Sequence, residues 1–94
     1  MNTPWGRSQS VKDLGSGVLS VTTASHGGIY VPVDQLKRIP REAQDYAKRW
    51  SGSKHWYEED CAWAHVAVSM PELFREDEVE CARSTVEWIA NVSR

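Results

Sequence analysis

Two short runs of apolar and β-branched residues, at 17–24 and 29–33, form the first clear pattern along the chain. Val, Ile and Thr favour strands because their branched side chains pack well on a pleated surface. Between the runs stands Ser25-His26-Gly27-Gly28, a composition typical of a turn, so the pattern predicts a β-hairpin over residues 17–33. Pro32 has no amide hydrogen to donate, so we expect the second strand to be an edge strand or to end there.

The residues before and directly after this hairpin show no long periodic pattern. Residues 1–16 are rich in Gly, Ser and polar residues, and we expect an irregular N-terminal segment held in place by Trp5. Asp34 stands where a helix N-cap is expected, before a short helical turn at 35–38 that Pro40 ends or redirects.

Two later segments have apolar residues at helical spacing. The first predicts a helix over 41–50, and the second predicts a longer helix over 76–92 with acidic residues crowding its first turns. The positions expected to face the core are Ala43, Tyr46, Ala47 and Trp50 on the first helix, and Val79, Ala82, Val86 and Ile89 on the second.

The segment between these helices leaves two secondary structures open. Trp56-Tyr57-Glu58-Glu59-Asp60 has the composition of a helix start, since acidic side chains interact favourably with the positive end of the helix dipole. Residues 59–69 are small and apolar with almost no polar face, which favours a helix buried on most sides, with a strand as the rival. Met70-Pro71 then ends the segment.

Length and composition place these elements in one domain. The chain has 94 residues, of which 40% are hydrophobic, and a division into two cores would leave each half too small to be stable. We therefore expect a single α+β domain over residues 1–94, with a small antiparallel sheet packed by about three helices and with residues 34–94 mainly helical. No segment has the ~20 apolar residues of a membrane span, and residues 1–7 lack the apolar run of a signal peptide, so we expect a cytoplasmic protein. Cys61 and Cys81 lack the CxxC spacing, and we expect free thiols.

Four sequence motifs resemble those of a known group of domains. They are Thr3-Pro4-Trp5-Gly6-x-x-Gln9, Thr22-Thr23-Ala24-Ser25-His26-Gly27-Gly28-Ile29, Trp56-Tyr57-Glu58-Glu59-Asp60-Cys61-x-Trp63 and Pro71-Glu72-Leu73-Phe74. In this order they resemble a family of uncharacterised domains carried by phages, plasmids and integrative elements, whose context is similar to that of antirestriction and anti-CRISPR genes. The resemblance covers residues 3–74 and implies a mobile-element origin, while the acidic helix after Phe74 has no counterpart in it.

The net charge of −2 conceals an asymmetry along the chain. Residues 1–55 carry eight Lys and Arg against four Asp and Glu, giving +4, whereas residues 56–94 carry three against nine, giving −6. An acidic surface repels nucleic acid and attracts basic protein grooves; the alternative is that both charged runs are only solvated surfaces.

The resemblance, taken with this charge, implies an inhibitor of a host defence complex, either a CRISPR–Cas or a restriction nuclease. Such inhibitors act by occupying a site, and carboxylates can exploit the salt-dependent attraction of a groove built for phosphate. The residues expected to form a DNA-mimicking, partner-binding surface are Glu72, Glu76, Asp77, Glu78, Glu80 and Glu87. We expect the protein to act in the cytoplasm of the host bacterium as a monomer or weak homodimer, with no catalytic residue, cofactor or metal and no direct binding to nucleic acid or membranes.

The turn Ser25-His26-Gly27-Gly28 is open to two interpretations. An exposed His beside glycines can serve as an acid, a base or a ligand. In the structural interpretation the glycines supply positive φ angles, and Ser25 and His26 fix the turn through local hydrogen bonds. A small hydrolase or transferase that uses His26 with Cys61, or with Glu58 and Asp60, is therefore the alternative function from a different class.

Two further alternatives rest on spacing and on charge. Cys61 and His65 stand four residues apart, which suits a metal pair or a thiolate–imidazolium pair on one helix face. Zinc would need two more ligands, from among His26, His55, Asp60 and Cys81. The third function is an accessory nucleic-acid-binding module acting through Lys37, Arg38, Arg41, Lys48 and Arg49, although such modules usually carry a larger basic excess.

Overall fold

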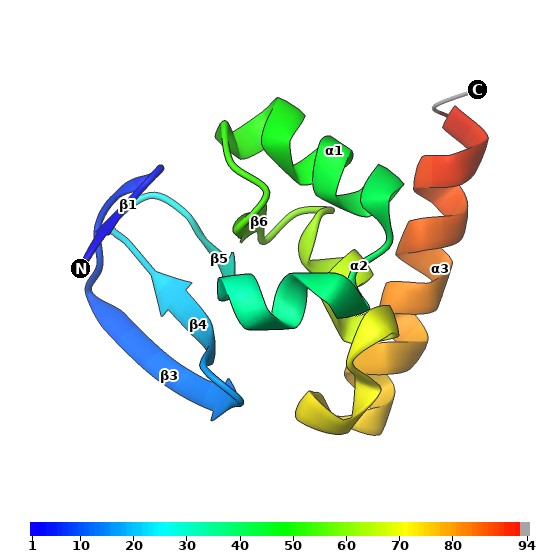
Figure 1. Cartoon of the computed structure of the whole chain (residues 1–94), viewed down its shortest axis with the longest axis horizontal. Helices are drawn as coiled ribbons and strands as arrows, with labels where there is room; N and C mark the ends of the chain where they lie inside the picture. Colours follow the sequence, from blue (N-terminus) through cyan, green and yellow to red (C-terminus); the bar gives the residue numbers. More distant parts are fainter. Residues whose placement is uncertain (93–94) are drawn as a thin grey trace.

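The computed structural model describes residues 1–92, with most strands in the first part of the chain and most helices in the second (Figure 1). In chain order the elements are β1 (Asn2–Thr3), β2 (Gly6–Arg7), β3 (Ser10–Gly15), β4 (Val18–Thr22), β5 (Gly27–Tyr30), the 3-10 helix η1 (Val33–Arg38), α1 (Arg41–Ser51), β6 (Trp56–Glu58), α2 (Trp63–Ser69), the 3-10 helix η2 (Pro71–Leu73) and α3 (Glu76–Val92). The predicted α+β class, with a small antiparallel sheet and about three helices, is confirmed.

A four-stranded antiparallel sheet with the strand order β3-β4-β5-β6 forms one layer of the protein. Strands β4 and β5 pair from Leu19–Tyr30 to Thr22–Gly27, which confirms the predicted hairpin. Strand β5 ends before Pro32, and β6 pairs with its other side. The short strands β1 and β2 form a separate two-stranded ribbon.

Three predictions of local structure are wrong. Asp34, expected to be a helix N-cap, lies inside η1, whose N-cap is Pro32. Ser10–Gly15, expected to be irregular, forms strand β3 and pairs with β4. This strand lacks an apolar pattern because it lies at the edge of the sheet, where even Val11 is 47% exposed. Trp56–Glu58, expected to start a helix, forms β6 because pairing with β5 satisfies its backbone groups. The helix that follows begins only at Trp63.

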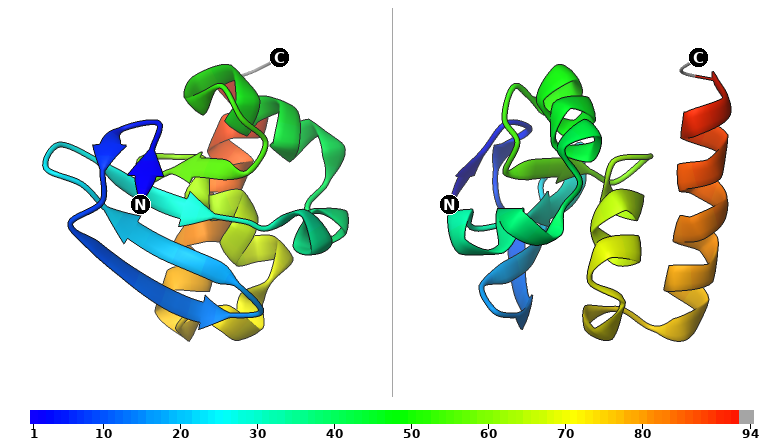
Figure 2. Two further views of the ribbon diagram at one scale, coloured as in Figure 1. Left: turned by 60° about the vertical axis from the view of Figure 1, so that its left-hand side comes forward. Right: turned by 45° about the vertical axis from the view of Figure 1, so that its right-hand side comes forward.

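The helices form a second region of the fold in which α2 is central. Figure 2 shows α2 between the sheet and α3, while α1 packs beside β6. The main core is built from buried residues of the sheet, η1, α1 and α2, namely Val18, Ile29, Val31, Leu36, Ile39, Ala43, Ala47, Tyr57, Ala62, Val66 and Met70. A smaller cluster of Ala64, Ala67 and Ala82 joins α2 to α3, and its small side chains let the two helices approach closely.

The amphipathic patterns predicted for α1 and α3 are confirmed except at one position. On α3 the predicted apolar side faces α2, with Val86 partly buried and the other three residues buried. On α1 the ring of Trp50 is 65% exposed, contrary to the prediction. The helix ends at Ser51, where Gly52 takes a left-handed conformation with φ 83°, so no further turn covers this ring. None of the helices in the described part of the chain is long and apolar enough to cross a membrane.

Candidate functional site

A hollow of about 400 Å³ brings together residues from distant parts of the chain. Its walls are Trp5, His26, Tyr46, Trp50, Glu58, Asp60 and Cys61, and we call it the acidic hollow. The residues of the hydrolase or transferase alternative, which are His26, Cys61, Glu58 and Asp60, all lie in this wall. The fold therefore brings these four residues together, whereas the sequence alone did not show whether they lie close to one another.

The turn that presents His26 is held by Thr23. The N–H of Thr23 donates to the His26 carbonyl oxygen at 2.7 Å, and the Thr23 hydroxyl donates to the same oxygen at 2.8 Å. The N–H of His26 donates to that hydroxyl at 3.1 Å. Thr23 is buried, whereas Ser25 and His26 are exposed. The buried threonine, rather than the side chains of Ser25 and His26, therefore fixes the turn.

Gly27 and Gly28 serve close packing and not the turn. They are the first residues of β5 and neither has a positive φ angle, contrary to the structural interpretation of the motif. A Cβ on Gly28 would overlap the Tyr57 carbonyl oxygen and lie 2.5 Å from a carbon of the Trp5 ring. The missing side chain lets Trp5 lie against the sheet, where its ring meets Trp56 edge-on at a centroid distance of 5.6 Å.

The carboxylate of Glu58 holds the turn between β6 and α2. Its Oε2 accepts a hydrogen bond from the N–H of Asp60 at 2.6 Å, and its Oε1 accepts from the N–H groups of Cys61 and Ala62 at 2.9 Å each. Three donors occupy lone pairs that a general base would need, so Glu58 is chiefly a structural residue. Asp60 is exposed and is the freer of the two carboxylates in the hollow.

Tyr46 separates the acidic hollow from a second hollow of about 510 Å³ between α1, α2 and α3. Its ring lies 6.3 Å from the Trp50 ring and 5.6 Å from the His65 ring. Burial, assisted by the neighbouring Cys61 and Glu58, raises the pKa of Tyr46 to about 12. His65 lines the second hollow, where burial lowers its pKa. Cys61 and His65 therefore open into different hollows instead of forming the pair that their spacing suggested.

The acidic hollow contains the side chains of an acid–base site without their hydrogen-bonded arrangement. Within residues 1–92, no hydrogen bond joins the ring of His26 to Cys61 or to either carboxylate. In the same residues no group of three or more His, Cys, Asp and Glu side chains is placed to hold a metal ion. The hollow offers a concave surface of aromatic rings and carboxylates, which suits binding more directly than catalysis.

Two arginines, Arg38 and Arg75, contact three of the six carboxylates of the predicted acidic surface. Glu72 accepts two hydrogen bonds from the Arg38 guanidinium, one of them at 2.9 Å, and this contact lowers the pKa of Glu72. Arg75 pairs with Asp77 at 3.1 Å and with Glu78 at 3.8 Å. The pKa of Asp77 is lowered by that hydrogen bond. These three carboxylates are already engaged within the protein.

The other three predicted acidic residues, Glu76, Glu80 and Glu87, lie on one side of α3. Spacings of four and seven residues return to nearly the same angle on a helix with 3.6 residues per turn. All three are exposed, and we call them the acidic stripe. Arg83 stands on the same side and approaches Glu80 at 3.9 Å, an exposed contact of little energy. Trp88, the neighbour of Glu87, is 56% exposed.

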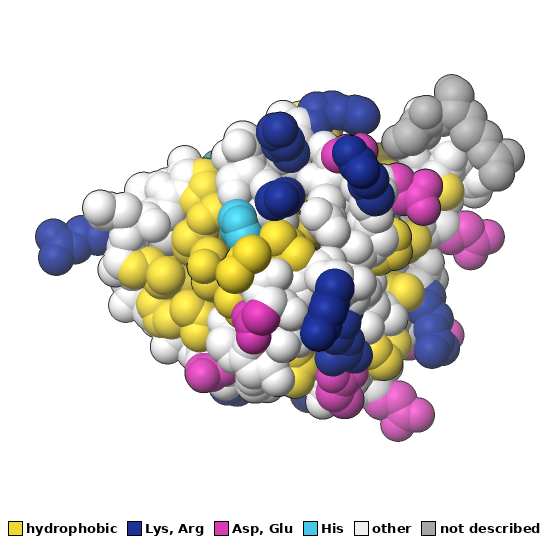
Figure 3. All heavy atoms as spheres, viewed as in Figure 1, with side chains coloured by type: hydrophobic (Ala, Val, Ile, Leu, Met, Phe, Trp, Pro, Cys, Tyr) yellow, Lys and Arg dark blue, Asp and Glu magenta, His cyan; other side chains and the backbone are white. Residues whose placement is uncertain are grey.

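Basic and acidic side chains are unevenly spread over the surface. Figure 3 shows most of the visible Lys and Arg side chains over the region of α1 and η1, with some acidic side chains beside them, and further acidic side chains along the edge where α3 lies. The basic residues considered for nucleic-acid binding are Lys37 and Arg38 of η1 and Arg41, Lys48 and Arg49 of α1. One of them, Arg38, is engaged by Glu72.

The model of a protein family described as a domain of unknown function, DUF7007, matches residues 1–91 of the chain. This chain belongs to the DUF7007 family. The match includes nearly all of α3, the helix that the motif resemblance over residues 3–74 does not reach. No curated protein and no solved structure matches the chain.

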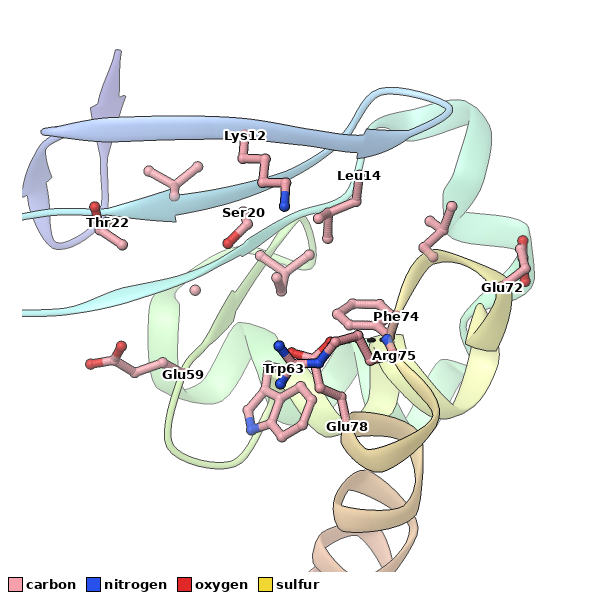
Figure 4. Close-up of a pocket in the computed structure, with 14 residues that line it drawn as sticks. Lys12, Leu14, Ser20, Thr22, Glu59, Trp63, Glu72, Phe74, Arg75 and Glu78 are labelled. Atoms are coloured by element: carbon pink, nitrogen blue, oxygen red, sulfur yellow. Dashed lines mark hydrogen bonds and ion pairs between the residues drawn. The ribbon is translucent and has the colours of Figure 1, made fainter.

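The DUF7007 domain has a further cleft that sequence reasoning missed, between the sheet and the helices (Figure 4). Its volume is about 540 Å³, and Lys12 points into it from β3. Trp63 and Phe74 face Lys12 with ring centroids 6.3 Å apart, and Arg75 and Glu78 lie beside them. Lys12 and Leu14 stand two residues apart, a spacing that would place them on the same face of a strand. This signal is weak because no strand was predicted there. Charges of both signs line the cleft and select no ligand class.

The aromatic walls of the acidic hollow also escaped the sequence analysis. Tyr46 and Trp50 were assigned to the core, and Trp5 was assigned to anchoring the N-terminal segment. In the DUF7007 domain all three rings line the hollow together with Glu58 and Asp60, and Tyr46 packs against the main core as well. Only the end of α1 at Ser51 hinted that Trp50 has too little chain around it to be covered.

Proposed function

We propose that this DUF7007 domain is an anti-defence protein of a phage or related mobile element that inhibits a host nuclease complex by binding to it. The motif resemblance supports the anti-CRISPR or antirestriction context. The observation that carries the proposal is the acidic stripe, because Glu76, Glu80 and Glu87 project from one exposed side of α3.

Three of the six predicted carboxylates contact arginines of the same chain, so the proposed interface is limited to the three carboxylates of the acidic stripe. Glu72, Asp77 and Glu78 are bound to arginines of the same chain. A nuclease groove that binds phosphate is rich in Lys and Arg, so an exposed row of carboxylates experiences the same salt-dependent attraction. Trp88, about 100° round the helix from Glu87, adds exposed apolar surface to α3, and exposed Trp residues are frequent anchors of protein interfaces.

Plasmid protection in bacteria tests this function. Cells that express a CRISPR–Cas or restriction nuclease are transformed with a targeted plasmid, with and without the DUF7007 domain. We expect protection against at least one such nuclease, and the variant E76K/E80K/E87K should abolish it while the thermal melting curve stays cooperative. The matched control D34K/E42K/D45K changes the net charge equally on exposed positions outside the stripe and should still protect.

Substitution of Arg83, which lies on the same side of α3 as the stripe, changes the local charge in the opposite direction to the triple reversal. Removing its positive charge by R83Q leaves the stripe more negative, so we expect tighter binding and stronger protection. If R83Q and the triple reversal affect protection equally, or if no nuclease of either class is inhibited, the proposed function is wrong.

A hydrolase or transferase is the second candidate, and the shared hollow of His26, Cys61, Glu58 and Asp60 favours it. This candidate predicts that H26A or C61A removes the biological effect at unchanged stability, because both groups would act on substrate. The inhibitor proposal predicts that C61A retains plasmid protection. The two candidates are therefore separated by the same assay.

A further inference from the structure

The acidic hollow has a chemical character that the proposed function does not use. Three of its seven lining residues are aromatic, Trp5, Tyr46 and Trp50, and two are carboxylates, Glu58 and Asp60. Among the described residues 1–92, no Lys or Arg lines it. The faces of aromatic rings are electronegative and attract cations, and carboxylates do so more strongly. Both kinds of wall therefore favour a positively charged ligand.

The rings reach the hollow from separate segments and are held in place there. Trp5 is carried by the β1–β2 ribbon, where the Thr3 hydroxyl accepts a hydrogen bond from the Trp5 N–H at 3.1 Å. Tyr46 and Trp50 project from successive turns of α1, with their ring planes inclined at 55°. Trp50 is 65% exposed, so its ring is accessible to a ligand.

The negative charge in the hollow is positioned and is not neutralised by a basic side chain. Three backbone N–H groups fix the orientation of the Glu58 carboxylate. Within residues 1–92, neither Glu58 nor Asp60 forms an ion pair with Lys, Arg or His, in contrast to Glu72 and Asp77. Of the lining residues in the part of the chain that the structure describes, only His26 can carry a positive charge. The hollow is therefore a preorganised cation-binding site, with one fixed carboxylate, Glu58, one free carboxylate, Asp60, and aromatic walls.

We propose that the acidic hollow binds the side chain of an arginine from the partner protein. This inference rests on the proposed function only in taking the occupant from a protein partner. A planar guanidinium stacks on aromatic rings and pairs with a carboxylate through two N–H groups, which a lysine ammonium does less well. A hollow of about 400 Å³ is large enough for one such side chain. Arginine is also abundant in grooves that bind phosphate, so this contact complements the acidic stripe.

Binding of the isolated side chain is tested first with capped arginine, N-acetyl-arginine methylamide. Because a single side chain binds weakly, the readout is the NMR shift of the five Trp indole N–H signals during titration. We expect the signals of Trp5 and Trp50 to move while that of Trp88 stays in place. Capped citrulline has nearly the same shape without the charge and should cause no shift. Equal shifts with citrulline, or shifts at Trp88 alone, would overturn the proposal.

Two substitutions at exposed positions test the walls without disturbing the core. We expect W50A and D60N each to weaken binding of capped arginine by roughly five- to tenfold, because each removes one cation-binding group. The control W88A removes an equally exposed tryptophan from α3 and should bind like the unsubstituted protein. Capped lysine should bind more weakly than capped arginine. Unchanged binding by both W50A and D60N would show that the hollow is not the site.

The source of the cation is tested by the double variant W50A/D60N in the plasmid protection assay. Loss of protection, with protection retained by the control V33A/D34N at two exposed positions outside the hollow and the stripe, supports an arginine of the partner protein. If W50A/D60N loses capped-arginine binding yet protects fully, the partner does not supply the cation and the proposal is overturned in favour of a free small molecule. If no nuclease is inhibited by any form, the proposed function fails while the titration still decides whether the hollow binds a guanidinium.

Discussion

Removal of one oxygen atom from the core, by Tyr57→Phe, should stabilise this protein. The Tyr57 side chain is completely buried, and its hydroxyl has no hydrogen-bond partner among residues 1–92. Burying an unpaired hydroxyl costs ~1–3 kcal/mol, whereas phenylalanine has the same shape without that group. After allowing for the small void that the missing oxygen leaves, we expect the free energy of unfolding to rise by about 1 kcal/mol. For a domain of this size that change corresponds to about 4–8 °C in melting temperature.

The pH dependence of the same variant provides a second measurement. Burial raises the pKa of the Tyr57 phenol far above its ordinary value of 10.0. The unfolded chain releases this proton near pH 10 while the folded chain keeps it, so stability falls as the pH rises above 10. We expect Y57F to lose part of this alkaline destabilisation, and Tyr46, whose pKa is also raised, to supply the remainder. Urea denaturation at pH 7 and pH 11 measures both effects.

Tyr30 provides the matched control for this prediction. Its ring is only partly buried, so Y30F removes a hydroxyl from a less demanding position and should change the free energy of unfolding by less than Y57F. If Y57F destabilises the protein at pH 7 by more than Y30F does, the Tyr57 hydroxyl makes a favourable contact, and the reasoning from an unpaired buried group is refuted.

Three further predictions concern residues around the candidate sites, each measured by urea denaturation. Gly28→Ala places a Cβ against the Tyr57 carbonyl and the Trp5 ring, and should cost ~1–3 kcal/mol of stability, whereas an unchanged midpoint would show that Trp5 moves freely. Glu58→Ala removes the acceptor of three N–H groups and should cost ~2 kcal/mol, with partial recovery in Glu58→Gln. Burial lowers the pKa of His65, so the unfolded state takes up its proton first and stability should fall as the pH drops through the ordinary value of 6.5; His65→Gln should flatten that slope.

The predictions made from the sequence succeeded where the interacting residues are close along the chain. The β4–β5 hairpin and the apolar side of α3 follow from strand and helix periods that a short window already contains. Edge strand β3 pairs with the next strand, β4, but its exposed side chains carry no apolar period that would have revealed it. Strand β6 had no such period because what defines it is hydrogen bonding to β5, which lies far away in the sequence. The composition of Trp56–Glu58 even favoured a helix, and pairing with β5 overrode it.

The sequence by itself determined the α+β class, the central hairpin, the long acidic helix and the unequal distribution of charge. Only the tertiary structure decided that Glu72 is paired and that Trp5 lies against the sheet, because their partners, Arg38 and Gly28, lie far from them along the chain. The acidic hollow is likewise assembled from the N-terminal ribbon, a turn of the sheet, α1 and the turn before α2. Contacts between distant segments leave no period in the sequence, so a site made of them becomes visible only when the chain is folded.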